Sequence, residues 1–393
     1  MPHWRSTHQV DARVSLGTDN GITSSHQDIP TFRGNQMIEG KAVFHSKRPQ
    51  SGLRYRVVVK GNVHTKTFDH TSSSMGSNAN YETHTFLSSI VFDGSSNDTD
   101  ADVEVPFAFM LQDRDVDVAQ PYRTEGGTIV QQLLPSLDSK DSGRHWSDAF
   151  KSEATAQYQV TYTIIASAFL DRKAVCSTTR RFHYVPVALS PLPQVPIEDY
   201  PGEYVLRTAK TQQKTASSTR IGVISQEPPP LTLSSGARQA STTIDLLLML
   251  VRSQSNFSTQ PLPKKYSVKT QLRTTTFVMR DPAPPEKHTL ENKSVNAPII
   301  RQEKGTIQSH ADAFAAWELH DSSDTDDDHN IHEEISTNSI SLPLTIDIDS
   351  HTGPSFWSPS LSRRHTIELS VTLDDDPSST TKLKLPVQIH YVS

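Results

Sequence analysis

Residues 158–170 read Tyr158-Gln-Val-Thr-Tyr-Thr-Ile-Ile-Ala-Ser-Ala-Phe-Leu170. Apolar side chains recur at every second position of this stretch, and most of the positions between them are polar. Because successive side chains of a strand point to opposite faces, this spacing predicts one long β-strand with a buried face. A one-residue slip would turn every side chain around, so we expect the alternate residues to face the core together. These residues are Tyr158, Val160, Tyr162, Ile164 and Ala166.

The same alternation recurs throughout the chain and indicates many strands with one buried face. The expected inward faces are Leu53/Tyr55/Val57/Val59, Val105/Phe107/Phe109/Leu111, Ile244/Leu246/Leu248/Leu250, Tyr266/Val268/Leu272, Ile340/Leu342/Leu344/Ile346/Ile348, Ile367/Leu369/Val371/Leu373 and Leu383/Leu385/Val387/Ile389/Tyr391. Leu247 and Met249 add apolar residues to the opposite face of their strand, which favours coverage of both faces. Pro386 lacks a backbone donor and predicts an edge strand or a bulge. Helical spacing is scarce, and residues 310–320 are the best short candidate.

The chain has 393 residues, a length that favours two domains. Five prolines lie between positions 186 and 201, and a run of this kind predicts an extended connector. We therefore predict an all-β fold of two antiparallel immunoglobulin-like β-sandwich domains. The predicted sections are a first sandwich at 10–190, a proline-rich linker at 191–201 with the boundary near 195, and a second sandwich at 202–393. Long polar loops are expected at 71–80, 282–301 and 320–337.

Composition and charge narrow the class of protein. The net charge of −6 gives no electrostatic reason to expect a nucleic-acid partner. One cysteine, Cys176, excludes an internal disulfide and suits a reducing compartment. The first fifteen residues carry no apolar run, so no secretory signal is expected. The longest apolar stretch, 244–251, is too short to span a bilayer. A cytoplasmic protein is the resulting expectation.

Catalytic patterns are weak. His329 and His332 lie among acidic residues and could bind a divalent ion, but no apolar stripe fixes their geometry, so a solvated loop is the preferred interpretation. No Gly-x-Ser-x-Gly elbow or phosphate-binding glycine loop is present in the sequence, and Cys176 is interpreted as a packed thiol. We therefore expect no catalytic residues, no metal and no cofactor. A metal-dependent hydrolase on a sandwich scaffold remains an alternative.

Two groups of residues are candidates for binding or modification. The candidate basic binding surface consists of Lys47, Arg48, Arg54, Arg56 and Lys60. It would bind an acidic tail or an anionic membrane surface, and its alternative is a solvated outer face of a sheet. The candidate phosphorylation sites are Ser322, Ser323 and Thr325, which precede acidic residues. Near the C-terminus, Arg363 or Arg364 is a candidate to pair with an acid at the interface between the domains.

The order of the motifs along the chain resembles the arrestin-like family, and in particular its fungal α-arrestin branch. The motifs are Gly34-Asn-Gln-Met-Ile-Glu-Gly40-Lys-Ala-Val-Phe44, Tyr55-Arg-Val-Val-Val-Lys-Gly61, Val105-Pro-Phe-Ala-Phe109, Gln132-Leu-Leu-Pro135-Ser136, Tyr158-Gln-Val-Thr-Tyr-Thr-Ile-Ile-Ala166, Arg180-Arg-Phe-His-Tyr-Val-Pro186, Pro354-Ser-Phe-Trp-Ser-Pro-Ser-Leu-Ser-Arg363-Arg-His-Thr-Ile-Glu-Leu-Ser-Val371 and Leu385-Pro-Val-Gln-Ile389. The resemblance implies an arrestin fold and a non-enzymatic adaptor in endocytosis and trafficking of membrane proteins. Its expected partners are membrane-protein cargo tails or trafficking proteins, with peripheral contact at the plasma membrane or endosomes.

The chain departs from the resemblance in its ligase-binding motifs. Members of the family recruit ubiquitin ligases through Pro-Pro-x-Tyr segments that dock on WW domains. Pro228-Pro-Pro-Leu231 lacks the tyrosine, and Leu262-Pro-Lys-Lys-Tyr266 has one residue too many. We therefore expect no direct binding to WW domains, so that any link to ubiquitination would run through partners. A structural subunit of a trafficking complex, like the related retromer component, is the alternative function.

Overall fold

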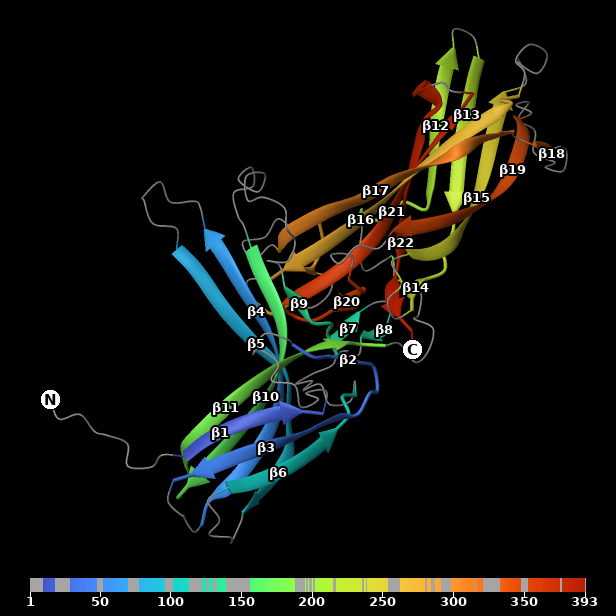
Figure 1. The fold of residues 1–393 in the computed structure, drawn as a ribbon. Coiled ribbons are helices and arrows are strands. Elements are labelled where there is room, and N and C mark those ends of the chain that lie inside the picture. Colours follow the sequence, from blue (N-terminus) through green and yellow to red (C-terminus); the bar gives the residue numbers. More distant parts are fainter. Residues whose placement is uncertain are drawn as a thin grey trace.

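The computed structural model is built almost entirely of β-strands. It describes residues 10–17, 29–47, 52–69, 78–95, 102–112, 122–124, 127–129, 133–138, 156–187, 195, 197, 200, 202–214, 217–234, 237, 239–253, 262–279, 281–283, 287–290, 298–314, 316–320, 333–347, 353–374 and 377–392. The strands form two groups of sheets that lie at opposite ends of an elongated molecule (Figure 1). The all-β prediction is confirmed.

The first group of sheets is made by the N-terminal half of the chain. Its strands are β1 (Val10–Leu16), β2 (Thr31–Arg33), β3 (Ile38–Ser46), β4 (Arg54–Asp69), β5 (Asn78–Ser95), β6 (Asp102–Phe109), β9 (Leu137–Asp138), β10 (Ala156–Leu170) and β11 (Lys173–Val185). One sheet has the order β1-β3-β6, and the other has the order β2-β11-β10-β4-β5 with β9 paired to β10. All pairs are antiparallel except β2 with β11. Positive φ angles at Asp171 and Arg172 allow the tight two-residue turn between β10 and β11.

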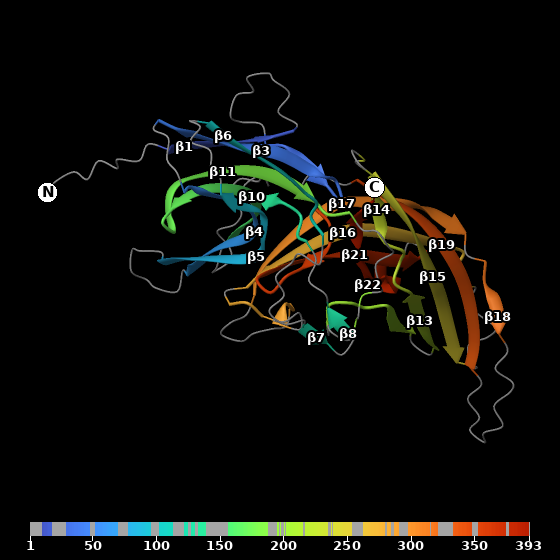
Figure 2. The same cartoon turned by 90° about the horizontal axis from the view of Figure 1, so that it is seen from below.

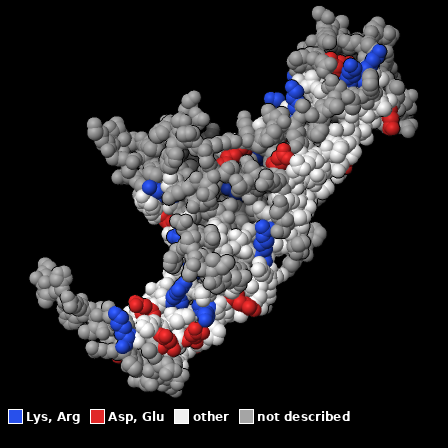
Figure 3. Space-filling view, in the orientation of Figure 1, with Lys and Arg blue, Asp and Glu red and all other residues white. Residues whose placement is uncertain are grey.

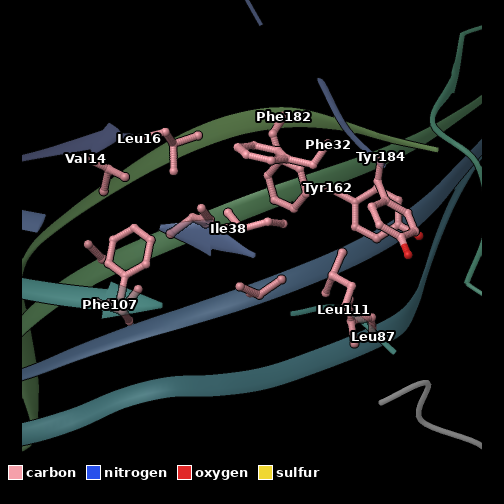
Figure 4. Packing of buried hydrophobic residues seen from close by; sticks show 14 of the residues in the cluster. Val14, Leu16, Phe32, Ile38, Leu87, Phe107, Leu111, Tyr162, Phe182 and Tyr184 are labelled. Atoms are coloured by element: carbon pink, nitrogen blue, oxygen red, sulfur yellow. The ribbon is translucent and has the colours of Figure 1, made fainter. Parts of the chain in front are cut away.

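The core of the first group lies between its two sheets. The five residues predicted to face inward from β10 are all buried, and none is more than 5% exposed. Tyr162 donates a hydrogen bond from Oη to the Leu134 carbonyl at 2.6 Å, which satisfies its hydroxyl in this apolar setting. Phe182 packs against both Phe32 and Tyr162 at centroid distances of 5.6 and 5.5 Å (Figure 4). The predicted register of β10 is confirmed.

The second group of sheets is made by the C-terminal half. Its strands are β12 (Arg207–Lys214), β13 (Ser217–Ser225), β14 (Leu231–Leu233), β15 (Gln239–Ser253), β16 (Lys265–Val278), β17 (Ile299–Phe314), β18 (Glu318–His320), β19 (Glu333–Asp347), β20 (Phe356–Trp357), β21 (Leu361–Leu373), β22 (Thr381–Val387) and β23 (Ile389–Tyr391), with the 3-10 helix η6 (Pro377–Ser379). The two larger sheets have the orders β12-β13-β15-β19-β18 and β17-β16-β21-β20, with β22 paired to β21. β14 runs parallel to β23. The short strands β7 (Tyr122–Thr124) and β8 (Gly127–Ile129), from the N-terminal half, pair with each other in a sheet of their own.

A second hydrophobic cluster fills the space between these C-terminal sheets. It contains the predicted inward residues of β15 and β21, such as Leu248 and Ile367, both fully buried. Leu247 and Met249 on the opposite face of β15 are half-buried, so the expected double-sided coverage holds in part. Pro386 lies in β22, which pairs within its sheet with β21 alone, and the predicted edge position is confirmed.

The two groups of sheets meet through residues from both halves of the chain (Figures 1 and 2). Val278, Phe356 and Leu361 come from the C-terminal half, yet they belong to the hydrophobic cluster of the first group. An isolated parallel bridge also joins Val187 to Tyr391. Gly34, with φ of +48°, packs so close to Val187 that an added Cβ would lie 2.8 Å from the valine Cβ. Apolar packing therefore continues across this junction.

Two local predictions from the sequence are wrong. Residues 310–320 do not form a helix: residues 310–314 end β17, residues 318–320 form β18, residues 316–317 precede β18 outside any strand, and residue 315 lies outside the described part. The helical spacing there spans only a few residues, and β17 instead pairs along β16, which satisfies the backbone groups of the segment. The expected polar loops are also shorter than predicted, since β5 begins at Asn78, β17 at Ile299 and β19 at Glu333.

Candidate functional site

The outer face of β4 carries a pair of arginines held by one carboxylate. Arg54 donates from Nε and Nη2 to the two carboxylate oxygens of Asp93 at 2.6 and 2.8 Å. Arg56 donates from Nε to Asp93 Oδ2 at 3.0 Å, and its guanidinium lies 5.6 Å from the centre of the Phe169 ring. Both arginines therefore lie on one face, as their spacing in the sequence predicts, and Asp93 on the neighbouring strand β5 fixes their geometry.

This pairing alters the charge of the face. The hydrogen bonds from Arg54, together with those from Arg56, hold the pKa of Asp93 below its usual range, so the carboxylate is ionised at neutral pH. One carboxylate faces two guanidinium groups, which leaves a local excess of positive charge. Positive and negative side chains lie interspersed over the end of the molecule formed by the first group of sheets (Figure 3).

The same outer face continues along the sheet with further polar and basic residues. Lys60 is half-buried on β4, and its cross-strand neighbour Thr163 on β10 pairs in turn with Arg181 on β11. His64 contacts the hydroxyls of Thr83 and Thr161, at 3.0 and 3.1 Å from its two ring nitrogens. Burial, and secondarily the charge of Arg181, lower the pKa of His64. His64 therefore adds no charge to this face at neutral pH.

The structure brings part of the predicted basic surface together. Arg54, Arg56 and Lys60 share the outer face of β4, whereas Lys47 follows the end of β3 in the other sheet of the group. Arg48 lies outside the described residues, as do the candidate phosphorylation sites and the two clustered histidines. The phosphorylation candidates concerned are Ser322, Ser323 and Thr325, and the histidines are His329 and His332.

Asp93 was not found by the reasoning from sequence. It lies 37 residues beyond Arg56, and only the register of β4 against β5 makes the two residues neighbours. The register cannot be read from spacing because β5 contains two bulges, near Val57/Val58 and Gly61/Asn62 of its partner.

A second polar cluster is buried near the junction of the two groups of sheets. Arg364 on β21 pairs with Glu203 at 2.8 Å, and only 11% and 6% of their side chains are exposed. The guanidinium lies 4.1 Å from the ring centres of both Tyr200 and Phe277. Of Arg363 and Arg364, the two arginines predicted as candidates to pair with an acid, Arg364 makes this pair. Glu203 also accepts a hydrogen bond from the Leu290 backbone at 3.0 Å.

The described residues contain no group of His, Cys, Asp and Glu with the geometry of a metal site. Within the same residues, no helix has both the length and the hydrophobicity needed to cross a membrane. No protein-family model matches the chain, and no curated protein matches its sequence.

Proposed function

We propose that this protein is an arrestin-like adaptor without enzymatic activity that binds acidic segments of membrane proteins during endocytosis and trafficking. In this proposal the two groups of sheets are two antiparallel immunoglobulin-like β-sandwich domains. The protein acts by binding its ligand on one sheet face and catalyses no chemical step. The support is the resemblance of the ordered motifs together with two hydrophobic clusters, one in each group of sheets, the first of which also includes Val278, Phe356 and Leu361 from the C-terminal half.

One observation carries the choice of an acidic ligand. Arg54 and Arg56 project from adjacent outward positions of β4 and share a single carboxylate, Asp93. Guanidinium groups held in a fixed orientation lose little side-chain entropy when they bind an incoming carboxylate or phosphate. Arg54 remains 58% exposed, so its charge is accessible to a partner. An extended acidic segment lying along the outer face of β4 fits this arrangement.

The alternative function, a structural subunit of a trafficking complex, is favoured by a different surface. The face of β15 opposite the core carries Leu247, Met249 and Val251, all half-buried. Ile224 on β13 pairs with Leu247, and Ile335 on β19 pairs with Val251, so the apolar residues are contiguous across three strands. The solvated face of an antiparallel sheet is normally polar. A stable partner covering this face would support the alternative.

The exchange of Asp93 for Asn tests the acidic-ligand proposal. Asp93→Asn keeps a carbonyl acceptor beside the two guanidinium groups, which preserves part of their orientation, and removes the negative charge that competes with an acidic ligand. We therefore expect Asp93→Asn to bind a fluorescein-labelled Glu-rich peptide about two- to five-fold more tightly, the range typical of one exposed charge contact. The double change Arg54→Gln with Arg56→Gln is expected to weaken binding. Fluorescence anisotropy at low salt measures both effects, and raising the salt concentration should reduce them.

Glu104→Gln provides a control with the same change in net charge. Glu104 pairs with Lys41 at 3.0 Å in the other sheet, and both side chains are more than half exposed. If Asp93→Asn and Glu104→Gln increase affinity equally, only the overall charge matters and the proposed site on β4 is wrong. Absence of peptide binding, with binding of phosphatidylserine vesicles in its place, would contradict a protein segment as the ligand.

A further inference from the structure

A side-chain hydrogen bond crosses directly between the two groups of sheets at their junction. Arg363 on β21 donates from Nη2 to the hydroxyl of Tyr158 on β10 at 2.9 Å, and from Nε to Thr276 at 3.2 Å. Arg363 is 4% exposed. Gly353 makes room for it, because a Cβ at that position would lie 2.7 Å from Nη1 of the arginine. The crossing contact therefore depends on the placement of Gly353.

His365 fixes that glycine in place. Its Nε2 lies 3.0 Å from the Gly353 carbonyl, which can only accept, so Nε2 carries the proton. Its Nδ1 lies 3.0 Å from the hydroxyl of Thr274 and accepts from it. The residue is 1% exposed. Both ring nitrogens are thus used by the neutral form, and a second proton, on Nδ1, would force the Thr274 hydroxyl to turn and accept this hydrogen bond.

His288 is held in the same way on the other side of β21. Its Nε2 lies 3.2 Å from the carbonyls of Ala283 and Pro359 and donates to them, and its Nδ1 accepts from the Ser362 hydroxyl at 2.9 Å. His288 is completely buried. Arg364 donates a hydrogen bond to the backbone carbonyl of this histidine. The neutral form is therefore built into this position as well.

The charges that surround the two histidines oppose their protonation. Arg364 and Glu203 lie beside His288. The guanidinium of Arg364 lies over the ring of Tyr200, and Tyr204 lies close enough to interact electrostatically with this guanidinium. Arg363 lies beside His365. Arg363 donates a hydrogen bond to the hydroxyl of Tyr158, and Tyr391 lies close enough to Arg363 to interact with its charge. Among these described neighbours the single carboxylate is that of Glu203, and Arg364 already neutralises it. A proton on either histidine would add a cation beside an arginine.

We propose that this junction is an acid-sensitive latch, in which protonation of His288 and His365 opens the Arg363–Tyr158 contact while the sheets of each half stay folded. Opening would also withdraw Phe356 and Leu361 from the first hydrophobic cluster. This inference goes beyond the proposed adaptor function, because it concerns how the two halves of the chain respond to pH. An adaptor working at acidifying compartments would then change its shape with the pH at the membrane.

The sign of the effect follows from the difference in proton affinity between the closed and open states. Burial first, and then the neighbouring arginine charge, lower the pKa of each histidine from 6.5 to about 3 in the closed state. Opening withdraws Phe356 together with the segment from Gly353 to Pro359, which supplies a carbonyl acceptor to each ring. In the open state each ring therefore regains an ordinary pKa, and opening is coupled to proton uptake below about pH 6.5. From pH 7.5 to 5.0 the ratio of open to closed molecules should rise about 30-fold for one histidine and about 900-fold for both.

Distance measurements between the two halves test the latch. Nitroxide labels on Ser88→Cys in β5 and Thr243→Cys in β15, both exposed positions, report the separation in a Cys176→Ser background. We expect one narrow distribution at pH 7.5 and a second, broader population at pH 5.0 that disappears when the pH is restored. Far-ultraviolet circular dichroism should stay unchanged over this range, because the strands of each half persist.

Two sets of variants assign the effect to the two histidines. His288→Gln with His365→Gln keeps hydrogen-bonding capacity but cannot take up a proton, so its distance distribution should not change with pH. His183→Gln, an exposed histidine on β11, should behave as the unsubstituted protein.

Several results would overturn the proposal. If the ratio of open to closed molecules changes less than about 5-fold between pH 7.5 and 5.0, fewer protons are coupled to opening than one histidine supplies. A change that persists in the double variant, or a simultaneous loss of strand signal, would also contradict it. Should the double variant fail to fold, the pH dependence of the unsubstituted protein and of each single variant decides the matter.

Discussion

Arg364→Met should lower the free energy of unfolding by about 3–5 kcal/mol, the range found when one partner of a buried ion pair is removed. The substitution fills much of the space of the arginine stem but leaves the carboxylate of Glu203 only 6% exposed and without its cation. It also removes the guanidinium from between the rings of Tyr200 and Phe277. The cost comes mainly from the uncompensated charge, since an ionised carboxylate loses its hydration when buried.

Urea denaturation followed by circular dichroism measures this loss, and two further variants define its cause. Lys41→Met breaks the exposed pair with Glu104, so it should cost less than about 1 kcal/mol. Adding Glu203→Leu to Arg364→Met removes the orphaned charge and should recover most of the stability. If the single variant costs no more than Lys41→Met, Glu203 is solvated or protonated without its partner, and the pair does not stabilise the junction.

The strands and their inward faces were predictable because the information is local. The alternation from Tyr158 to Ala166 lies within nine residues, and it needs no knowledge of which strand pairs with which. The burial of those residues and of Ile367 to Leu373 on β21 follows directly from a period of two. Residues 310–320 mark the limit of this reasoning, because a short stretch with helical spacing was overridden by pairing of its first part with β16 and of its last part with β19.

The polar contacts of both candidate sites were not predictable, because they join residues far apart in the chain. Asp93 meets Arg56 through strand register, and Glu203 meets Arg364 across 161 positions. Proximity of this kind depends on topology, which sequence spacing alone does not contain. The basic residues of β4 were identified from their type, while the acid that orients them required the structure.

The inward face of β10 makes a sharp prediction about stability. Ile164 is fully buried between its cross-strand partners Val59 on β4 and Arg180 on β11. Ile164→Ala should therefore cost about 2–5 kcal/mol, because it removes buried methyl and methylene groups and leaves a cavity that a central strand cannot collapse. Equilibrium denaturation in urea gives the difference, with the slope of the transition checked for two-state behaviour.

Ile90→Ala is the matched control, since it makes the same chemical change in the same sheet. Ile90 lies on the edge strand β5 and is 58% exposed, so its truncation should change the free energy of unfolding by less than about 0.5 kcal/mol. The contrast between the two isoleucines isolates burial from the change in side-chain volume and strand propensity. Equal costs at the two positions would mean that β10 does not present Tyr162, Ile164 and Ala166 to the core, and the register of the sheet would be wrong.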